Sequence, residues 1–160
     1  AAVNLSAITR AIQPGYRIVA LQMAPDAVRA ALLVSTPADG IRLLLAAVLV
    51  QSGTAMFGQP VTVGTTGLTD PAAISWYDAY HLAVLASGGI YDIPLTGGAG
   101  QQPSPQLMSA LPTNSQTLTL TTDGTELVVG TTAGVWAEPV SAPGTWLPFA
   151  TNGSNPVYPG

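Results

Sequence analysis

Residues 72–96, AAISWYDAYHLAVLASGGIYDIPLT, decide the fold because short apolar runs alternate in them with tight-turn residues. Ile74 and Trp76 alternate toward an Asp-Ala turn, and the run LAVL that follows is continuously apolar. Gly88 and Gly89 then turn the chain into a third run, IYDI. Apolar runs of this length between turn residues are typical of antiparallel strands joined by hairpins. The stretch therefore predicts three consecutive strands.

The same pattern recurs on both sides of this stretch. It is aligned on three aspartates, of which the second lies 52 residues after the first and the third 45 residues after the second. Each aspartate is followed by a small residue, then by a polar or charged residue three positions on, and then by an apolar run. Repeats of about 40 to 50 residues with four short strands each are typical of β-propeller blades. The aspartates are Asp26, Asp78 and Asp123, and the polar residues that follow them are Arg29, His81 and Glu126.

The predicted fold is all-β, a partial β-propeller of about three blades, each an antiparallel four-stranded sheet. A closed propeller has about four to eight blades, so three blades do not close a ring. The chain is either a fragment of a larger propeller or an open partial propeller covered by another element, and the sequence favours the fragment. In the first unit, a pair of buried helices is the alternative to strands, and Pro37 and Gly40 argue against it. The fourth strand of this unit is expected at Val61–Val63. One domain is expected, with a leader at 1–15, blade-like units at 16–64, 68–112 and 113–151, and a tail at 152–160.

Residues 1–13 allow two interpretations. Apolar residues at i, i+4 spacing would suit a short helix, and a strand or leader that docks on the core fits equally well. The sequence leaves this choice open.

The charge distribution excludes several functions. Hydrophobic residues make up 48% of the 160 residues and charged residues 8%, with a net charge of −4 and no lysine. The basic residues all lie within the first 42 residues, whereas nucleic-acid binding needs clustered cations. Neither a nucleic acid nor an anionic lipid surface is an expected partner. The chain has no cysteine, so it can form neither a disulfide nor a thiolate metal site. The basic residues are Arg10, Arg17, Arg29 and Arg42.

Catalytic chemistry has few candidates in the sequence. His81 is the one histidine, with Ser75 and Asp78 close to it along the chain. A Ser–His–Asp triad is defined by geometry, but the sequence has no G-x-S-x-G elbow, and the other two units also place a polar residue at the His81 position. The carboxylates show no metal-ligand spacing. We therefore expect no catalytic residues, no cofactor and no metal.

The aspartates and tryptophans have structural interpretations. A carboxylate at a hairpin tip can accept hydrogen bonds from the backbone N–H groups of the turn, which predicts a structural role for Asp26, Asp78 and Asp123. Trp76 is expected in the core. Trp136 and Trp146, in the last unit, are candidate interface residues because aromatic side chains often anchor interfaces.

With the repeat in view, the chain resembles the C-terminal β-propeller domain of the actinobacterial LpqB lipoproteins over residues 16–160. The resemblance rests on the lead-in LTDP at 68–71 with ISWYDAYHLAVL at 74–85, the hairpin IYDIPLTGG at 90–98, and the ending PVYPG at 156–160. In most blades of the family the first turn is Asp-Gly, whereas two of the three turns here are Asp-Ala. The anchoring cysteine and the amino-terminal domains of the family are absent from this sequence, as expected for a C-terminal piece.

The resemblance implies a function without catalysis. It implies an exported lipoprotein on the outer side of the cytoplasmic membrane, held there by a lipid anchor that this chain lacks. The implied role is that of a protein-interaction domain accessory to the MtrAB two-component system, with the sensor kinase MtrB and the lipoprotein's own amino-terminal domains as partners. The alternative is a small-molecule-sensing or hydrolase-like domain with a pocket near the propeller axis that includes His81.

Overall fold

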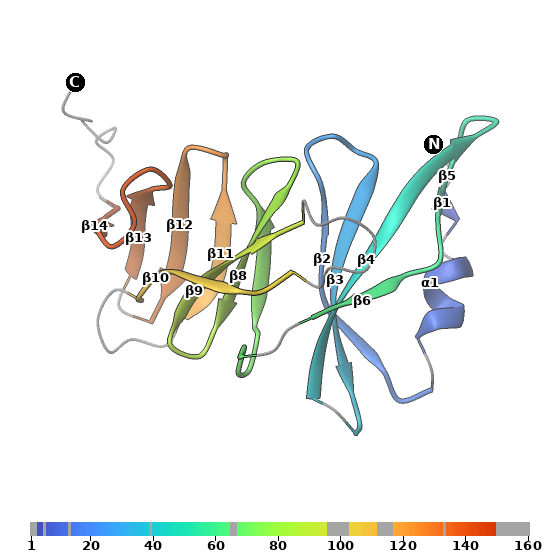
Figure 1. The fold of residues 1–160 in the computed structure, drawn as a ribbon, viewed down its shortest axis with the longest axis horizontal. Coiled ribbons are helices and arrows are strands. Elements are labelled where there is room, and N and C mark those ends of the chain that lie inside the picture. Colours follow the sequence, from blue (N-terminus) through green and yellow to red (C-terminus); the bar gives the residue numbers. More distant parts are fainter. Residues whose placement is uncertain are drawn as a thin grey trace.

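The computed structural model describes residues 3–4, 6–12, 14–38, 40–64, 67–95, 103–111, 117–132 and 134–149. These residues form three β-sheets that stand side by side, in chain order from right to left in Figure 1. The predicted all-β propeller architecture is confirmed. We call the three sheets blades 1, 2 and 3.

Blade 1 is an antiparallel sheet with the order β2-β3-β4-β6, followed by an extension. The first half of β4 pairs with β3 and β6, as predicted for a fourth strand at Val61–Val63. The second half of β4 pairs instead with β5, which pairs in parallel with β1. The strands are β2 (Arg17–Met23), β3 (Arg29–Thr36), β4 (Gly40–Gln51), β6 (Val61–Val63), β5 (Thr54–Phe57) and β1 (Val3–Asn4).

Blades 2 and 3 are antiparallel sheets of four strands in sequence order. The first strand of each blade contacts the first strand of the next, so that β2 lies against β7 and β7 against β11. Blade 2 contains β7 (Ala73–Trp76), β8 (His81–Ala86), β9 (Gly89–Pro94) and β10 (Gln106–Ser109). Blade 3 contains β11 (Thr117–Thr122), β12 (Glu126–Thr131), β13 (Gly134–Pro139) and β14 (Leu147–Pro148).

The continuous apolar run of β8 exists because both faces of blade 2 are covered. Leu82 and Val84 pack into a core cluster shared with blade 1, whereas Ala83 and Leu85 pack into a cluster shared with blade 3. Successive side chains of a strand point to opposite faces, so a strand in a central layer must be apolar at every position. Trp76 lies in the cluster between blades 1 and 2, which confirms its predicted place in the core.

A third core cluster covers the face of blade 1 that points away from blade 2. Ile8 of the short helix α1 (Ser6–Ala11) and Phe57 of β5 pack there against Ala30, Leu32 and Val34 of β3. The segment predicted as a leader thus contains both a helix and a strand, the two forms that the sequence left open. It covers one end of the row of blades, at the right of Figure 1.

Several details differ from the sequence-based expectation. The strands β5 and β10 were not anticipated. The last strand, β14, has only two residues, and the chain before it forms a turn in which the N–H of Ala142 donates to the oxygen of Pro139. Asp39, residues 96–102 and the tail at 152–160 lie outside the described residues. In the part of the chain that the structure describes, no helix has the length and apolar character needed to cross a membrane.

Candidate functional site: the aspartate rim

The three aspartate turns lie along one edge of the molecule, at the top of Figure 1, because each joins the first two strands of its blade. We call this edge the aspartate rim and define it by residues 26–29, 78–81 and 123–126. In each turn the backbone N–H two residues after the aspartate donates to its carboxylate. The rim is therefore built three times from the same local interaction.

In the first turn, Asp26 is bound by the backbone and by Arg29. Its Oδ1 accepts a hydrogen bond from the Val28 N–H at 3.1 Å, and its Oδ2 lies 2.6 Å from Nη2 of Arg29. The Arg29 guanidinium, together with the Val28 N–H, holds the pKa of Asp26 below its usual value. Ala27 has a φ of 58°, a left-handed conformation that costs a residue with a Cβ atom about 1–2 kcal/mol.

In the second turn, Asp78 binds both the backbone and the imidazole of His81. Its Oδ1 accepts from the N–H groups of Tyr80 at 2.6 Å and His81 at 2.7 Å, and its Oδ2 lies 2.7 Å from Nδ1 of His81. Partial burial opposes ionisation, but these hydrogen bonds outweigh it and lower the pKa of Asp78. The His81 ring stacks on Tyr77 with centroids 5.5 Å apart. The hydrogen bonds to Asp78 and the stacking of His81 on Tyr77 together hold this turn in place.

In the third turn, Asp123 accepts only from its own turn. Its Oδ1 receives the N–H of Thr125 at 2.8 Å, the hydroxyl of Thr125 at 2.8 Å and the N–H of Glu126 at 3.0 Å. The N–H of Thr125, followed by that of Glu126, lowers the pKa of Asp123. Gly124 has a φ of 95°, and a Cβ atom there would lie 2.9 Å from the backbone oxygen of Tyr77. This turn therefore packs closely on the second.

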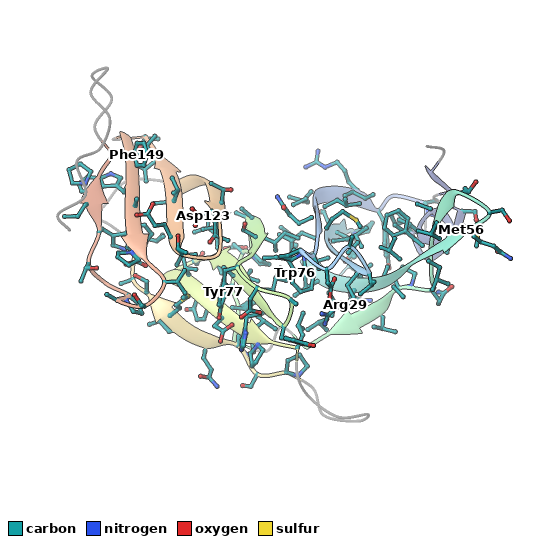
Figure 2. The ribbon with its side chains drawn as sticks, turned by 90° about the horizontal axis from the view of Figure 1, so that it is seen from above. Arg29, Met56, Trp76, Tyr77, Asp123 and Phe149 are labelled. Carbon is teal, nitrogen blue, oxygen red and sulfur yellow. The ribbon has the colours of Figure 1, made fainter. Side chains whose placement is uncertain are left out.

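Arg29 joins the first two turns of the rim. Its guanidinium carbon lies 5.7 Å from the ring centroid of Trp76 and 5.1 Å from that of Tyr80, and its Nη2 donates to the backbone oxygen of Ala79. These contacts combine cation–π attraction with a charge-assisted hydrogen bond. Figure 2 shows Arg29 and Trp76 next to each other at the junction of blades 1 and 2. The side chain of Arg29 thus fixes the spacing of two turns from different blades.

Tyr77 links the rim to the inside of blade 2. Partial burial and its hydrogen bond to Asp92 both raise the pKa of the Tyr77 hydroxyl, so it stays protonated. The Oδ1 atom of Asp92 is buried and has no hydrogen-bond partner among the residues that the structure describes. Tyr77 therefore anchors the second turn through its hydroxyl and supports the His81 ring through its face.

A second polar cluster joins blades 2 and 3 at β10. Glu138 is 1% exposed, and its Oε2 accepts from the hydroxyl of Ser109 at 3.1 Å and from the N–H of Gly144 at 2.6 Å. Trp146 donates its indole N–H to the oxygen of Ala110 at 2.8 Å, with Ser109 Oγ at 3.1 Å. Burial raises the pKa of Glu138. The cluster fastens the loop before β14 to blade 2.

The two candidate interface tryptophans are each partly exposed and partly packed against the core. Trp136 and Trp146 are both half-buried and pack against the core cluster between blades 2 and 3. Among the described residues, the exposed aromatic side chains are instead Tyr80, which is 55% exposed on the rim, and Phe149 after β14. A signal for Tyr80 was present in the sequence, because it directly follows the predicted Asp-Ala turn.

Among the described residues, the rim forms neither a metal site nor a hydrolytic triad. In the described ranges, no three His, Asp and Glu side chains gather where they could hold a metal ion. Ser75 is buried on β7, where it pairs with Ala83, and Asp78 remains about half exposed. A buried aspartate that orients the histidine, as in hydrolytic triads, is thus missing from this site. What the rim offers is exposed Tyr, Val and Asp side chains on a rigid set of turns.

One family of known proteins matches this chain. No curated protein matches the chain. A family model described as the lipoprotein LpqB beta-propeller domain matches residues 1–159, which includes the amino-terminal helix and strand beyond the expected range of 16–160. Because the match spans nearly the whole sequence and agrees with the three-blade architecture, the chain belongs to the LpqB β-propeller domain family.

Proposed function

We propose that this chain is a non-enzymatic protein-interaction domain of an exported lipoprotein of the cell envelope. The observation that carries the proposal is its membership of the LpqB propeller family, whose description names a lipoprotein. The propeller supplies a rigid scaffold, and function on such scaffolds resides in surface sites and loops. Within this proposal the domain is accessory to the MtrAB two-component system, and its partner is the sensor kinase MtrB.

The aspartate rim is the surface that we propose for this partner. Tyr80 is 55% and Val28 54% exposed, and both flank Arg29 at the junction of blades 1 and 2. Tyrosine and arginine are enriched among residues that dominate binding energies, and side chains already held in place lose little entropy on binding. The hydrogen bonds of the Asp26 and Asp78 turns provide this order.

The test is a binding measurement between the purified chain and the extracytoplasmic part of MtrB. We expect saturable binding that Tyr80→Ala weakens at least tenfold, the loss of about 1.4 kcal/mol that defines an energetically important contact. Leu107→Ala is the matched control, because Leu107 is an exposed apolar residue on β10, the outermost strand of blade 2, where it pairs with Tyr91 and not with a residue of the rim. Thermal unfolding of both variants shows whether the fold is intact.

Two outcomes count against this proposal. Absence of binding by the folded chain and by the full-length lipoprotein contradicts MtrB as the partner. Binding that Tyr80→Ala and Leu107→Ala affect equally contradicts the rim as the binding surface.

A further inference from the structure

Buried polar atoms without a partner gather at the junction between blades 2 and 3. Among the described residues, three buried side-chain atoms have no hydrogen-bond partner, and these are Asp92 Oδ1, Trp136 Nε1 and Glu138 Oε1. Their cross-strand partners all belong to the core cluster between the two blades and are, in the same order, Ala83, Val129 and Leu127. Opposite residues of an antiparallel pair share one face of the sheet. All three polar side chains therefore point into this junction.

The other two tryptophans show how a buried indole N–H is paired in this protein. Trp76, between blades 1 and 2, donates to the backbone oxygen of Gln22 at 3.3 Å. Trp146 donates to the backbone oxygen of Ala110 at 2.8 Å. The N–H of Trp136 is buried and lacks such an acceptor among the described residues. Because buried polar groups are nearly always hydrogen-bonded, a partner of another kind is expected at Trp136.

Glu138 places an acceptor next to this donor. The side chain is 1% exposed, and its Oε2 already accepts from the hydroxyl of Ser109 and the N–H of Gly144, which leaves Oε1. Trp136 and Glu138 lie two residues apart on the same face of β13, so about 7 Å separates their positions along the strand. A water molecule that makes two hydrogen bonds spans about 5–6 Å between its partners. The spacing of the two side chains therefore suits a bridge through one water.

Water also has the hydrogen-bonding groups that this pair requires. Its oxygen can accept the N–H of Trp136 while one of its hydrogens binds Oε1 of an ionised Glu138. If Glu138 is protonated, its proton lies on Oε1, because Oε2 already accepts two hydrogen bonds, and the second lone pair of the water accepts that proton's hydrogen bond. A metal ion fits poorly, since an indole N–H can donate but cannot act as a ligand. The bridge thus forms in either protonation state.

We propose that one buried water molecule bridges Trp136 Nε1 and Glu138 Oε1 in the junction between blades 2 and 3. Waters of this kind typically make two to four hydrogen bonds to polar groups that are otherwise unpaired. The water extends the network that runs from Glu138 to Ser109 of β10 and to the loop at Gly144. It is a structural ligand of the domain. The site is separate from the aspartate rim and from any partner bound there.

The three tryptophans provide an internal comparison in solution. In an isotope-labelled chain each indole N–H gives its own resonance, and single substitutions assign them: Trp76→Phe, Trp136→Phe and Trp146→Phe. We expect a nuclear Overhauser effect from bound water to the indole proton of Trp136, and none to those of Trp76 and Trp146, which donate to backbone oxygens. Trp136→Phe should also remove one long-lived water from the water relaxation dispersion of the protein. Trp76→Phe, the matched control in the other junction, should remove none, and circular dichroism checks that both variants fold.

A high-resolution crystal structure of the unaltered chain tests the same site without any variant. The proposal predicts a water peak within about 3.2 Å of both Trp136 Nε1 and Glu138 Oε1. A junction without this peak overturns the proposal, as does a direct hydrogen bond from the Trp136 indole to Glu138 or to a backbone oxygen. A folded Trp136→Phe variant that retains every long-lived water of the wild type overturns it as well.

Discussion

Replacement of Ala27 by glycine should stabilise the protein. Ala27 is exposed at the first aspartate turn and has a φ of 58°. A left-handed conformation costs an L-residue about 1–2 kcal/mol, and glycine avoids this cost but loses about 0.5–1 kcal/mol of additional chain entropy on folding. The net gain for Ala27→Gly lies between about 0 and 1.5 kcal/mol, with a central value of about 0.75 kcal/mol. For a chain of this length, this gain corresponds to a rise of about 1–4 °C in Tm.

Ala79 provides a matched control because it occupies the same place in the second turn. It is not among the described non-glycine residues with positive φ, which are Ala27, Ser52 and Asp70. Ala79→Gly therefore adds only the entropic cost and should lower stability by about 0.5–1 kcal/mol. Urea unfolding of the wild type and both variants measures the two changes, which should have opposite signs. A loss of stability in Ala27→Gly equal to that in Ala79→Gly would refute the assignment of strain to Ala27.

Three further substitutions test the packing between blades. Gly124→Ala should destabilise the protein by more than about 1 kcal/mol, because it combines a φ of 95° with a Cβ position 2.9 Å from a backbone oxygen of blade 2; thermal unfolding measures this. Arg29→Ala removes two cation–π contacts, the hydrogen bond to Ala79 and the ion pair with Asp26, and should cost about 1–3 kcal/mol in urea unfolding. Unchanged stability would contradict a joining role for Arg29. Burial raises the pKa of Glu138, so its contribution to stability is present below about pH 4.5 and is lost as the pH rises through the folded-state pKa. Between pH 4 and pH 8, wild type should therefore lose stability relative to Glu138→Gln, and a constant difference would contradict a buried carboxylate.

The repeat was readable from the sequence because each blade uses the same local chemistry. The aspartate turns require a carboxylate followed by free backbone N–H groups, and this need places Asp26, Asp78 and Asp123 at recurring positions. The continuous run in β8 follows from burial on both faces. Local requirements of this kind restrict which residue types can occupy these positions, so the positions can be recognised in the sequence.

Features that depend on distant contacts were not readable. Strand β5 exists because the β4 backbone changes partners halfway along its length, and β10 begins after a Gly- and Pro-rich segment that gives no strand signal. The packing of Trp136 and Trp146 against the cluster between blades 2 and 3, and the contact of Trp146 with Ser109, bring together residues from two blades. The contact of Arg29 with the Ala79 oxygen joins residues 50 positions apart. No local pattern encodes such a pairing.

The interaction role of the rim is tested most directly by hydrogen exchange of the chain with and without the extracytoplasmic part of MtrB. We expect slower exchange of the backbone amides at 26–29 and 78–81 in the complex, with little change in β10 around Leu107. Tyr80→Ala should abolish the slowing at both turns. Unchanged exchange along the rim under conditions in which the two proteins bind would contradict the rim as the interaction surface.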